Sequence, residues 1–353
     1  MFILYTTEDM LYRICENASS DSVLDLWYKI ILSTKQVAIQ KNQIDTENTW
    51  IRVLHRMGVS IYTEQEWLEN VVADNQHVLE EPTASFLLDF PSNLLKKLQN
   101  NYGIACFDAK SITSSPFFTN RGWHVDTDDD DKVKSWDALL GDLAIPSNSI
   151  VIVDRYLFSS AHGESIEDSF TNLKQILEKL LPISMAPDIL DVTIVYDFDT
   201  INFKKDKKLD GSEIDMPYLA KRINKLKKEI SRPYAYNISL ISINSKCLNY
   251  DTTHNRKIFS NYYIIRAEHK IKSYNEKGKS LCYHALTFSY IFYDGLYDIS
   301  SIPEKSKDST IKAIQEIIKS ESKAIMPSMI IYRNGQHIPI TEYSNVLLSG
   351  TEI

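Results

Sequence analysis

Apolar residues follow two patterns along this chain. In some segments they form short unbroken runs, and in others they recur every three or four positions. The short runs predict buried strands, and the periodic segments predict amphipathic helices. Strands are therefore expected at 1–5, 84–90, 104–107, 149–153, 191–196, 238–243 and 286–292, and helices at 20–31, 46–57, 63–73, 92–99, 165–180, 215–230 and 306–323.

Signals at the ends of these segments support several of the predicted elements. Ser165 and Asp168 have the spacing of a capping box, in which each side chain satisfies a backbone amide at the helix start. Thr63 and Glu66 have the same spacing and predict the start of the 63–73 helix. Asn334–Gly335 separates two apolar segments, which predicts a tight β-hairpin.

The order of these elements predicts the fold class. Strands alternate with helices, which is typical of an α/β protein with a mixed, mostly parallel sheet flanked by helices. The strand, helix and strand at 84–107 predict a parallel pair joined by a crossover. Three units are expected: a helix-rich α/β part at 1–148, a second α/β domain at 149–298, and a C-terminal helix and hairpin at 299–353.

The composition is that of a globular protein, with 43% hydrophobic and 24% charged residues in 353. The formal net charge is −8, so any nucleic-acid site is expected to be a local basic patch. The four cysteines are widely spaced, which disfavours a zinc site or a disulfide framework. No apolar run is long enough for a membrane span and no secretion signal is evident, so a cytoplasmic location is expected.

One stretch of the sequence contains side chains that could bind a phosphate group. His254 and Arg256 precede the apolar run 258–259, and Ser260–Asn261 is expected to separate that strand from the next one at 262–265. Side chains two positions apart on a strand point to the same face, so the imidazole and the guanidinium are expected to hold one phosphate between them. Chance alone predicts about one His-x-Lys/Arg triplet in a chain of this composition. The triplet therefore needs support from its surroundings.

A basic block precedes this stretch. Ten basic residues lie within 29 positions: Lys204, Lys205, Lys207, Lys208, Lys221, Arg222, Lys225, Lys227, Lys228 and Arg232. On the predicted 215–230 helix they alternate with the apolar stripe, so Lys221, Arg222, Lys225 and Lys228 are expected to bind nucleic acid. An ordinary solvated helix face accounts for the same pattern equally well.

Acidic residues at predicted strand ends suggest a rival chemistry. Asp108, Asp154, Asp197 and Asp199 each follow an apolar run, and together they would suit Mg²⁺ in a metal-dependent nuclease. A further acidic run at 126–131 lacks the alternating ligands and turn glycine of a calcium loop. It is interpreted as a solvated loop, and no metal or cofactor is assigned in the leading interpretation.

The segments IVIVDRYLF, which contains Asp154, and THNRKIFSNYYII, which contains His254 and Arg256, resemble the phospholipase-D-like superfamily. The compact variant found at the C-terminus of some MIT-domain proteins and in bacterial gene clusters is the most similar. The resemblance implies a phospholipase-D-like second half. It also implies His254 as nucleophile, Arg256 as phosphate clamp and Asp154 as the orienting group. Active members carry two His-x-Lys motifs followed by Asp, whereas this chain has one His-x-Arg and no matching Asp. Either two chains pair their histidines, or the site binds phosphate without cleaving it.

The predicted function is phosphodiester binding and possible cleavage, with nucleic acid ahead of phospholipid as the ligand. The resemblance implies a component of a bacterial antiviral defence or nucleic-acid-processing system. The alternative is a non-catalytic interaction subunit with a degenerate phosphate site, in which the C-terminal helix and hairpin dock a protein partner. A homodimer is compatible with both interpretations.

Overall fold

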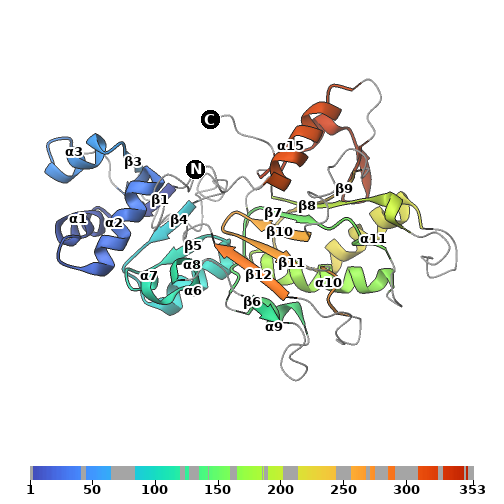
Figure 1. Cartoon of the computed structure of the whole chain (residues 1–353), viewed down its shortest axis with the longest axis horizontal. Coiled ribbons are helices and arrows are strands. Elements are labelled where there is room, and N and C mark those ends of the chain that lie inside the picture. Colours follow the sequence, from blue (N-terminus) through green and yellow to red (C-terminus); the bar gives the residue numbers. More distant parts are fainter. Residues whose placement is uncertain are drawn as a thin grey trace.

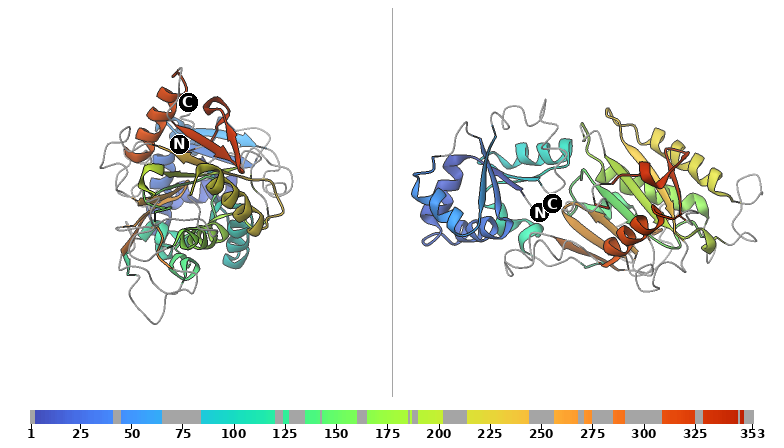
Figure 2. Two further views of the ribbon diagram at one scale, coloured as in Figure 1. Left: turned by 90° about the vertical axis from the view of Figure 1, so that its right-hand side faces the viewer. Right: turned by 90° about the horizontal axis from the view of Figure 1, so that it is seen from above.

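The computed structural model contains two β-sheets that lie side by side, each with helices packed against it (Figure 1, Figure 2). The structure describes residues 3–40, 45–64, 84–119, 124–126, 135–141, 143–159, 165–184, 186, 190–201, 214–243, 256–267, 271–274, 285–290, 309–324, 329–345 and 347–348. The predicted α/β class is confirmed.

The first sheet is wholly parallel and has the strand order β3-β2-β1-β4-β5. Its strands are β1 (Ile3–Thr6), β2 (Gln36–Gln40), β3 (Ser60–Glu64), β4 (Ala84–Leu87) and β5 (Ala105–Phe107). The helices around it are α1 (Glu8–Asn17), α2 (Ser22–Thr34), α3 (Thr49–Arg56) and α6 (Ser92–Tyr102). Leu4 packs with α1 and α2, whereas Tyr5 packs with Leu95 of α6, so helices cover both faces.

The second sheet has the order β14-β13-β9-β8-β7-β10-β11-β12-β6 among the described strands. Its strands are β6 (His124–Asp126), β7 (Ile150–Val153), β8 (Asp191–Tyr196), β9 (Asn237–Ser242), β10 (Arg256–Ser260), β11 (Tyr263–Ala267), β12 (Ala285–Tyr290), β13 (Ile330–Arg333) and β14 (Gln336–Ile338). Parallel pairing is confined to the centre, β7 with β8 and β8 with β9. The flanking strands are antiparallel, so this sheet is mixed.

The two faces of the central strands are covered by different helices. Apolar residues that alternate along β7, β8 and β9 pack either with α10 (Ile166–Leu180) and α11 (Met216–Glu229) or with α15 (Ser309–Glu321). Figure 1 shows α15 on one side of these strands and α10 on the other. Both sides are therefore buried, which explains the unbroken apolar runs in the sequence.

The capping box and the hairpin turn predicted from the sequence both form at the expected positions. The Ser165 hydroxyl accepts a hydrogen bond from the Asp168 amide, and the Asp168 carboxylate accepts one from the Ser165 amide. Asn334 and Gly335 both have positive φ angles, 50° and 87°, as a two-residue hairpin turn requires. The predicted hairpin between β13 and β14 and the predicted C-terminal helix are both confirmed.

Other expectations were wrong. Thr63 lies in β3 and pairs with Ile39, so it does not begin a helix; the remainder of that predicted helix, 65–73, lies outside the described residues. The segment 109–148, for which no helix or strand was predicted, contains α7 (Ser111–Ser114), α8 (Pro116–Thr119), β6 and α9 (Trp136–Leu140). The second sheet takes strands from all three predicted units, since β6 lies before residue 149 and β13 and β14 lie after residue 298.

Aromatic side chains join the two sheets. Phe117 of α8 contacts Phe107 at the end of β5 and also Tyr263 of β11, with ring centroids 5.8 and 6.4 Å away. The Tyr262 hydroxyl donates a hydrogen bond to the carbonyl of Gly103, 3.3 Å away. The sheets therefore share one hydrophobic core.

No helix within the described parts of the chain has both the length and the apolar character needed to cross a membrane.

Candidate functional site

Asp154 lies at the carboxyl end of β7, in the middle of the second sheet, and its side chain is completely buried. Its Oδ1 atom accepts a hydrogen bond from the Tyr156 amide, and its Oδ2 atom accepts one from the Ile271 amide, both at 3.0 Å. Open α/β sheets bind ligands beyond the carboxyl ends of their parallel strands. Asp154 therefore occupies the edge at which a ligand is expected.

Two ion pairs stand at this edge. Arg256, the first residue of β10, places Nε 3.7 Å from Oδ1 of Asp154. Arg155 places Nε 3.3 Å from Oδ2 of Asp197, which follows β8. Both arginine side chains keep a small exposed fraction, 13% for Arg256 and 17% for Arg155, so each is partly accessible to solvent.

The two arginines are brought together by one aromatic ring. The guanidinium carbon of Arg155 lies 5.3 Å from the centre of the Tyr156 ring, and that of Arg256 lies 5.7 Å from it. Both contacts are within the range of cation–π attraction. Two planar cations from neighbouring strands thus share one small region of the sheet edge.

The charged groups at this edge balance, with three cations and three carboxylates. Lys272 is 1% exposed, and its ammonium group donates hydrogen bonds to the carbonyls of Ser159, at 2.6 Å, and Ser165, at 3.5 Å. Burial raises the pKa of Asp154, while the positive charges of Arg256 and Lys272 lower it. Three cations therefore accompany the two buried carboxylates, and the exposed Asp199 lies next to Asp197 at the rim.

The segment that carries Lys272 is anchored by a buried asparagine. Asn172 of α10 accepts hydrogen bonds at Oδ1 from the amides of Ser273 and Tyr274 and from the Trp136 indole. Its Nδ2 donates to the carbonyls of Asp168 and Tyr274. Because Asn172 is fully buried, these bonds hold residues 271–274 against β7 and α10.

The predicted nucleophile, His254, lies outside the described residues. Strand β10 begins at Arg256 and pairs antiparallel with β7, with Lys257 opposite Val153. The predicted turn at Ser260–Asn261 is confirmed, because β10 and β11 form an antiparallel hairpin around it. Arg256 and Asp154 are thus brought together, and Asp154 has a definite role: it neutralises Arg256.

The predicted acidic metal cluster is not formed. Asp108 ends β5 in the first sheet, where its carboxylate accepts hydrogen bonds from the Ser111 amide and the Ser92 hydroxyl. Asp154 and Asp197 each face an arginine. In the described ranges no three His, Cys, Asp or Glu side chains are grouped so that they could hold a metal ion. The acidic run at 128–131 lies outside those ranges.

The four basic residues predicted on α11 have different surroundings. Arg222 forms an ion pair with Glu167 of α10, and its guanidinium lies 4.8 Å from the Phe170 ring centre. Lys225 pairs with Glu229 at 3.7 Å. Lys221 and Lys228 are exposed. Arg222 is therefore engaged within the fold, and only part of the predicted basic face remains open to a ligand.

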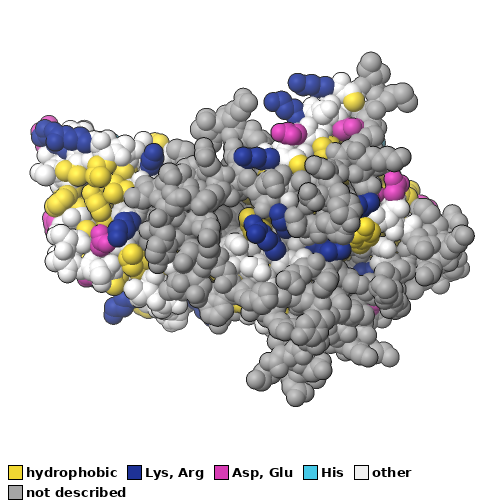
Figure 3. Space-filling model, in the orientation of Figure 1, with side chains coloured by type: hydrophobic (Ala, Val, Ile, Leu, Met, Phe, Trp, Pro, Cys, Tyr) yellow, Lys and Arg dark blue, Asp and Glu magenta, His cyan; other side chains and the backbone are white. Residues whose placement is uncertain are grey.

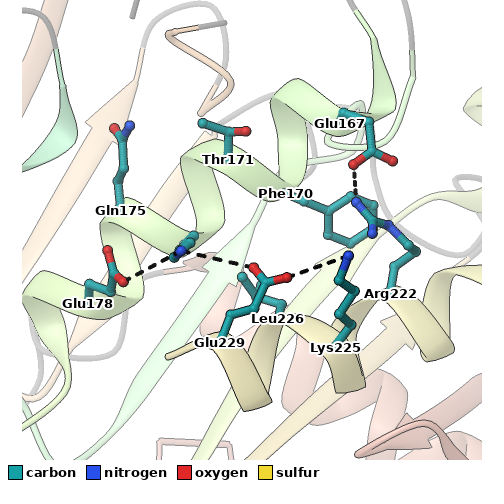
Figure 4. Close-up of a pocket in the computed structure, with 10 residues that line it drawn as sticks. Glu167, Phe170, Thr171, Gln175, Glu178, Arg222, Lys225, Leu226 and Glu229 are labelled. Atoms are coloured by element: carbon teal, nitrogen blue, oxygen red, sulfur yellow. Dashed lines mark hydrogen bonds and ion pairs between the residues drawn. The ribbon is translucent and has the colours of Figure 1, made fainter. Parts of the chain in front are cut away.

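These ion pairs cross a groove between α10 and α11 (Figure 4). The groove has a volume of about 480 Å³. Glu167 and Arg222 lie at one end with Lys225 beside them, Glu178 lies at the other end, and Glu229 lies between. Its three acidic and three basic lining side chains compensate each other, so the groove has no net attraction for a polyanion.

Basic side chains are also visible elsewhere on the surface. Figure 3 shows Lys and Arg side chains near the middle of the face where β7 and β10 lie in Figure 1. Sequence patterns did not identify Arg155, Lys272 or Asn172 as site residues. The hydrogen-bonding partners of Lys272 and Asn172 are distant in the chain, and the partner of Arg155 is Asp197, which follows a different strand.

No model of a known protein family matches this chain, and no curated protein sequence matches it either. The resemblance to the phospholipase-D-like superfamily therefore stays a prediction from short motifs.

Proposed function

We propose that the carboxyl edge of the second sheet binds the phosphodiester backbone of a nucleic acid. The observation that carries this proposal is the gathering of Arg155 and Arg256 around the Tyr156 ring. A guanidinium group can donate two parallel hydrogen bonds to phosphate oxygens, and its planar shape also stacks on aromatic rings. Tyr156 adds a ring against which a nucleobase can stack.

The buried carboxylates have a positioning role in this proposal. Asp154 and Asp197 contact the Nε side of Arg256 and Arg155, so they restrict the rotamers of both arginines before a ligand arrives. A preorganised cation loses less conformational entropy on binding. Lys272 stabilises the ionised form of Asp154 from within the fold. A bacterial role in defence or nucleic-acid processing remains part of the same proposal and rests on the sequence resemblance, whereas the proposed cytoplasmic location rests on the cysteine spacing and the short apolar runs of the sequence.

Binding is proposed rather than cleavage. In the mechanism that the resemblance implies, a His254 nitrogen attacks phosphorus, a P–N bond forms, and the P–O bond to the leaving sugar oxygen breaks as that oxygen takes a proton. A second histidine would have to supply that proton, and the sequence offers no second motif. The arginines need no such partner to hold a phosphate.

The alternative role for the C-terminal helix and hairpin, docking of a protein partner, receives less support. Ile311 and Ile314 of α15 and Ile331 of β13 are buried against the central strands. The apolar surface that would attract a partner is thus used within the chain.

Binding can be tested by fluorescence anisotropy with labelled single-stranded and duplex DNA and RNA, in a series of salt concentrations. We expect Arg256→Gln and Arg155→Gln each to weaken binding roughly tenfold and to lower the salt slope by about one. Arg52→Gln on the exposed face of α3 is the matched control and should change neither quantity. Absence of binding by the wild type, or equal affinity for Arg256→Gln and wild type, would contradict the proposal.

Two further measurements test which ligand is preferred and whether nucleic acid is cleaved. Vesicles that contain anionic phospholipid test whether a lipid headgroup is preferred over nucleic acid. Incubation of labelled DNA and RNA with EDTA present tests for metal-independent cleavage, and loss of that cleavage in His254→Ala would extend the proposal to catalysis.

A further inference from the structure

The face of the second sheet that α15 covers is divided into an apolar half and a polar half. Toward the carboxyl ends of the central strands it presents Val151, Val153, Val195, Ile241 and Ile243, which pack with α15 and β13. Toward the amino ends of the same strands it presents Ser149, Asp191, Thr193 and Ser239, all of them buried. A row of four buried polar side chains is uncommon on the inner face of a sheet, because each one needs a hydrogen-bonding partner.

Residues 343–345 and 347–348, here called the strap, cover the polar half. Asn345 is 1% exposed, and its Nδ2 donates hydrogen bonds to the Asp191 carbonyl at 2.6 Å and to the Thr193 hydroxyl at 3.0 Å. The Tyr343 hydroxyl lies 2.6 Å from the same Thr193 hydroxyl. Leu348 adds one buried apolar side chain beside α15, and Tyr343 and Leu347 pack partly against the same cluster. The strap is therefore held by apolar contacts together with hydrogen bonds, and water can replace the hydrogen bonds when the strap leaves.

Asp191 is the charged centre of this contact. Its carboxylate accepts a hydrogen bond from Ser239 at 2.8 Å and lies 3.2 Å from Nε of Arg333 on β13. Tyr343 faces it from the strap, and Lys227 of α11 acts on it electrostatically. Arg333 keeps 20% of its side chain exposed, so solvent screens part of its charge. The negative charge of the ionised Asp191 carboxylate is thus only partly compensated while the strap is closed.

We propose that the strap is a reversible cover over the polar half of this face and that ionisation of Asp191 favours its opening. Opening returns Asp191, Thr193 and Ser149 to water and withdraws Leu348 from the apolar cluster, whose members on the sheet stay covered by α15. The strap lies at the amino edge of the parallel strands, opposite the Asp154 edge, so this inference does not depend on the proposed nucleic-acid binding.

The direction of the pH effect follows from burial. With the strap closed, desolvation raises the pKa of Asp191 to about 6, and Ser239 and Arg333 offset only part of this effect. With the strap open, water returns and the pKa falls toward its ordinary value of 3.8. The ionised form therefore favours the open strap. Between pH 5 and pH 8 the opening equilibrium is expected to rise roughly tenfold.

Amide hydrogen exchange of the full chain, followed by mass spectrometry and corrected for the intrinsic pH dependence, measures this equilibrium. The amides of Leu347 and Leu348 are hydrogen-bonded to Asn345, so their exchange reports the strap. We expect their opening constant to rise about tenfold from pH 5 to pH 8 in the wild type and to be independent of pH in Asp191→Asn. The amides of β8 should stay protected throughout.

Thr193→Val provides a second variant, because it removes the hydroxyl that Tyr343 and Asn345 share while retaining side-chain shape and Asp191. It should increase strap exchange at every pH. The same hydroxyl also hydrogen-bonds to the Asp191 carboxylate at 3.4 Å and lowers its pKa, so the pH dependence should persist and be at least as steep as in the wild type. A pH-independent strap in the wild type, an unchanged pH dependence in Asp191→Asn, or no faster exchange in Thr193→Val would each overturn the proposal. Equal loss of protection in β8 would do so as well, since the strap would then open only with the whole sheet.

Discussion

Gly103 and Pro182 approach each other so closely that a β-carbon on Gly103 would lie 2.7 Å from Cγ of the proline ring. Gly103 ends α6 in the left-handed conformation, with φ at 64°, and the backbone of Ser147 also lies nearby. A rigid ring and a backbone segment cannot both move away easily. This contact joins the first sheet to the segments that precede β7 and follow α10.

Replacement of Gly103 by alanine should therefore destabilise the protein through both strain and overlap. We expect the free energy of unfolding to fall by about 2–3 kcal/mol, as measured by urea denaturation. Gly58→Ala is the matched control, because Gly58 also has a positive φ of 81° but no atom within 4 Å of the added carbon. That variant should lose only about 1 kcal/mol. Equal losses in the two variants would contradict the role of the Pro182 contact.

Asp154→Ala should be strongly destabilising, because it leaves Arg256 without its carboxylate and removes the acceptor of the Ile271 and Tyr156 amides. Loss of one partner from a buried ion pair costs about 3–5 kcal/mol, and the partial exposure of Arg256 places the expected value near the lower limit. The measurement is equilibrium unfolding in denaturant. Asp199→Ala, at an exposed position in the 3-10 turn Phe198–Thr200, should change stability by less than about 0.5 kcal/mol.

Asn172→Ala should release residues 271–274 from α10. The substitution removes five hydrogen bonds at a fully buried position, and we expect a loss of about 2–4 kcal/mol in the free energy of unfolding. Amide exchange of Ser273 and Tyr274 should accelerate even where the sheet remains protected. Asn17→Ala is the control, since Asn17 is exposed and donates one bond to Arg13. Unchanged exchange at Ser273 would refute this role of Asn172.

Global stability should also depend on Asp191. Because its pKa in the folded protein is about 6, above the ordinary value of 3.8, this residue contributes stability that is fully present below pH 3.8 and is lost as pH rises through 6. The free energy of unfolding of the wild type, relative to that of Asp191→Asn, should therefore fall between pH 4 and pH 7, by on the order of 2 kcal/mol. A difference that stays constant over this range would show that Asp191 ionises normally.

The sequence predicted best those features that depend on neighbouring residues. The Ser165 and Asp168 capping box and the Asn334–Gly335 turn form as expected, because short-range backbone geometry determines them. The Thr63 signal failed because β3 pairs in parallel with β2, and this long-range pairing overrides a local capping preference.

The candidate site was predictable only in part. Asp154 and Arg256 were both expected, and their ion pair follows from the pairing of β7 with β10. Lys272 gave no such signal, because its acceptor in Ser159 lies 113 positions away in the chain. The ion pair of Arg222 with Glu167 similarly spans 55 positions, which is why the basic face of α11 was overestimated.

The β13–β14 hairpin has a consequence for the newly synthesised chain. Strand β9 is almost entirely buried, and β13 forms hydrogen bonds along the edge that β9 would otherwise present. A ribosome completes β9 long before it reaches residue 330, so for that interval a hydrophobic strand has an unsatisfied edge and is open to aggregation. At this edge the outermost described strand, β14, is only three residues long and carries exposed Gln336 and His337, which makes it a poor template for pairing with another molecule.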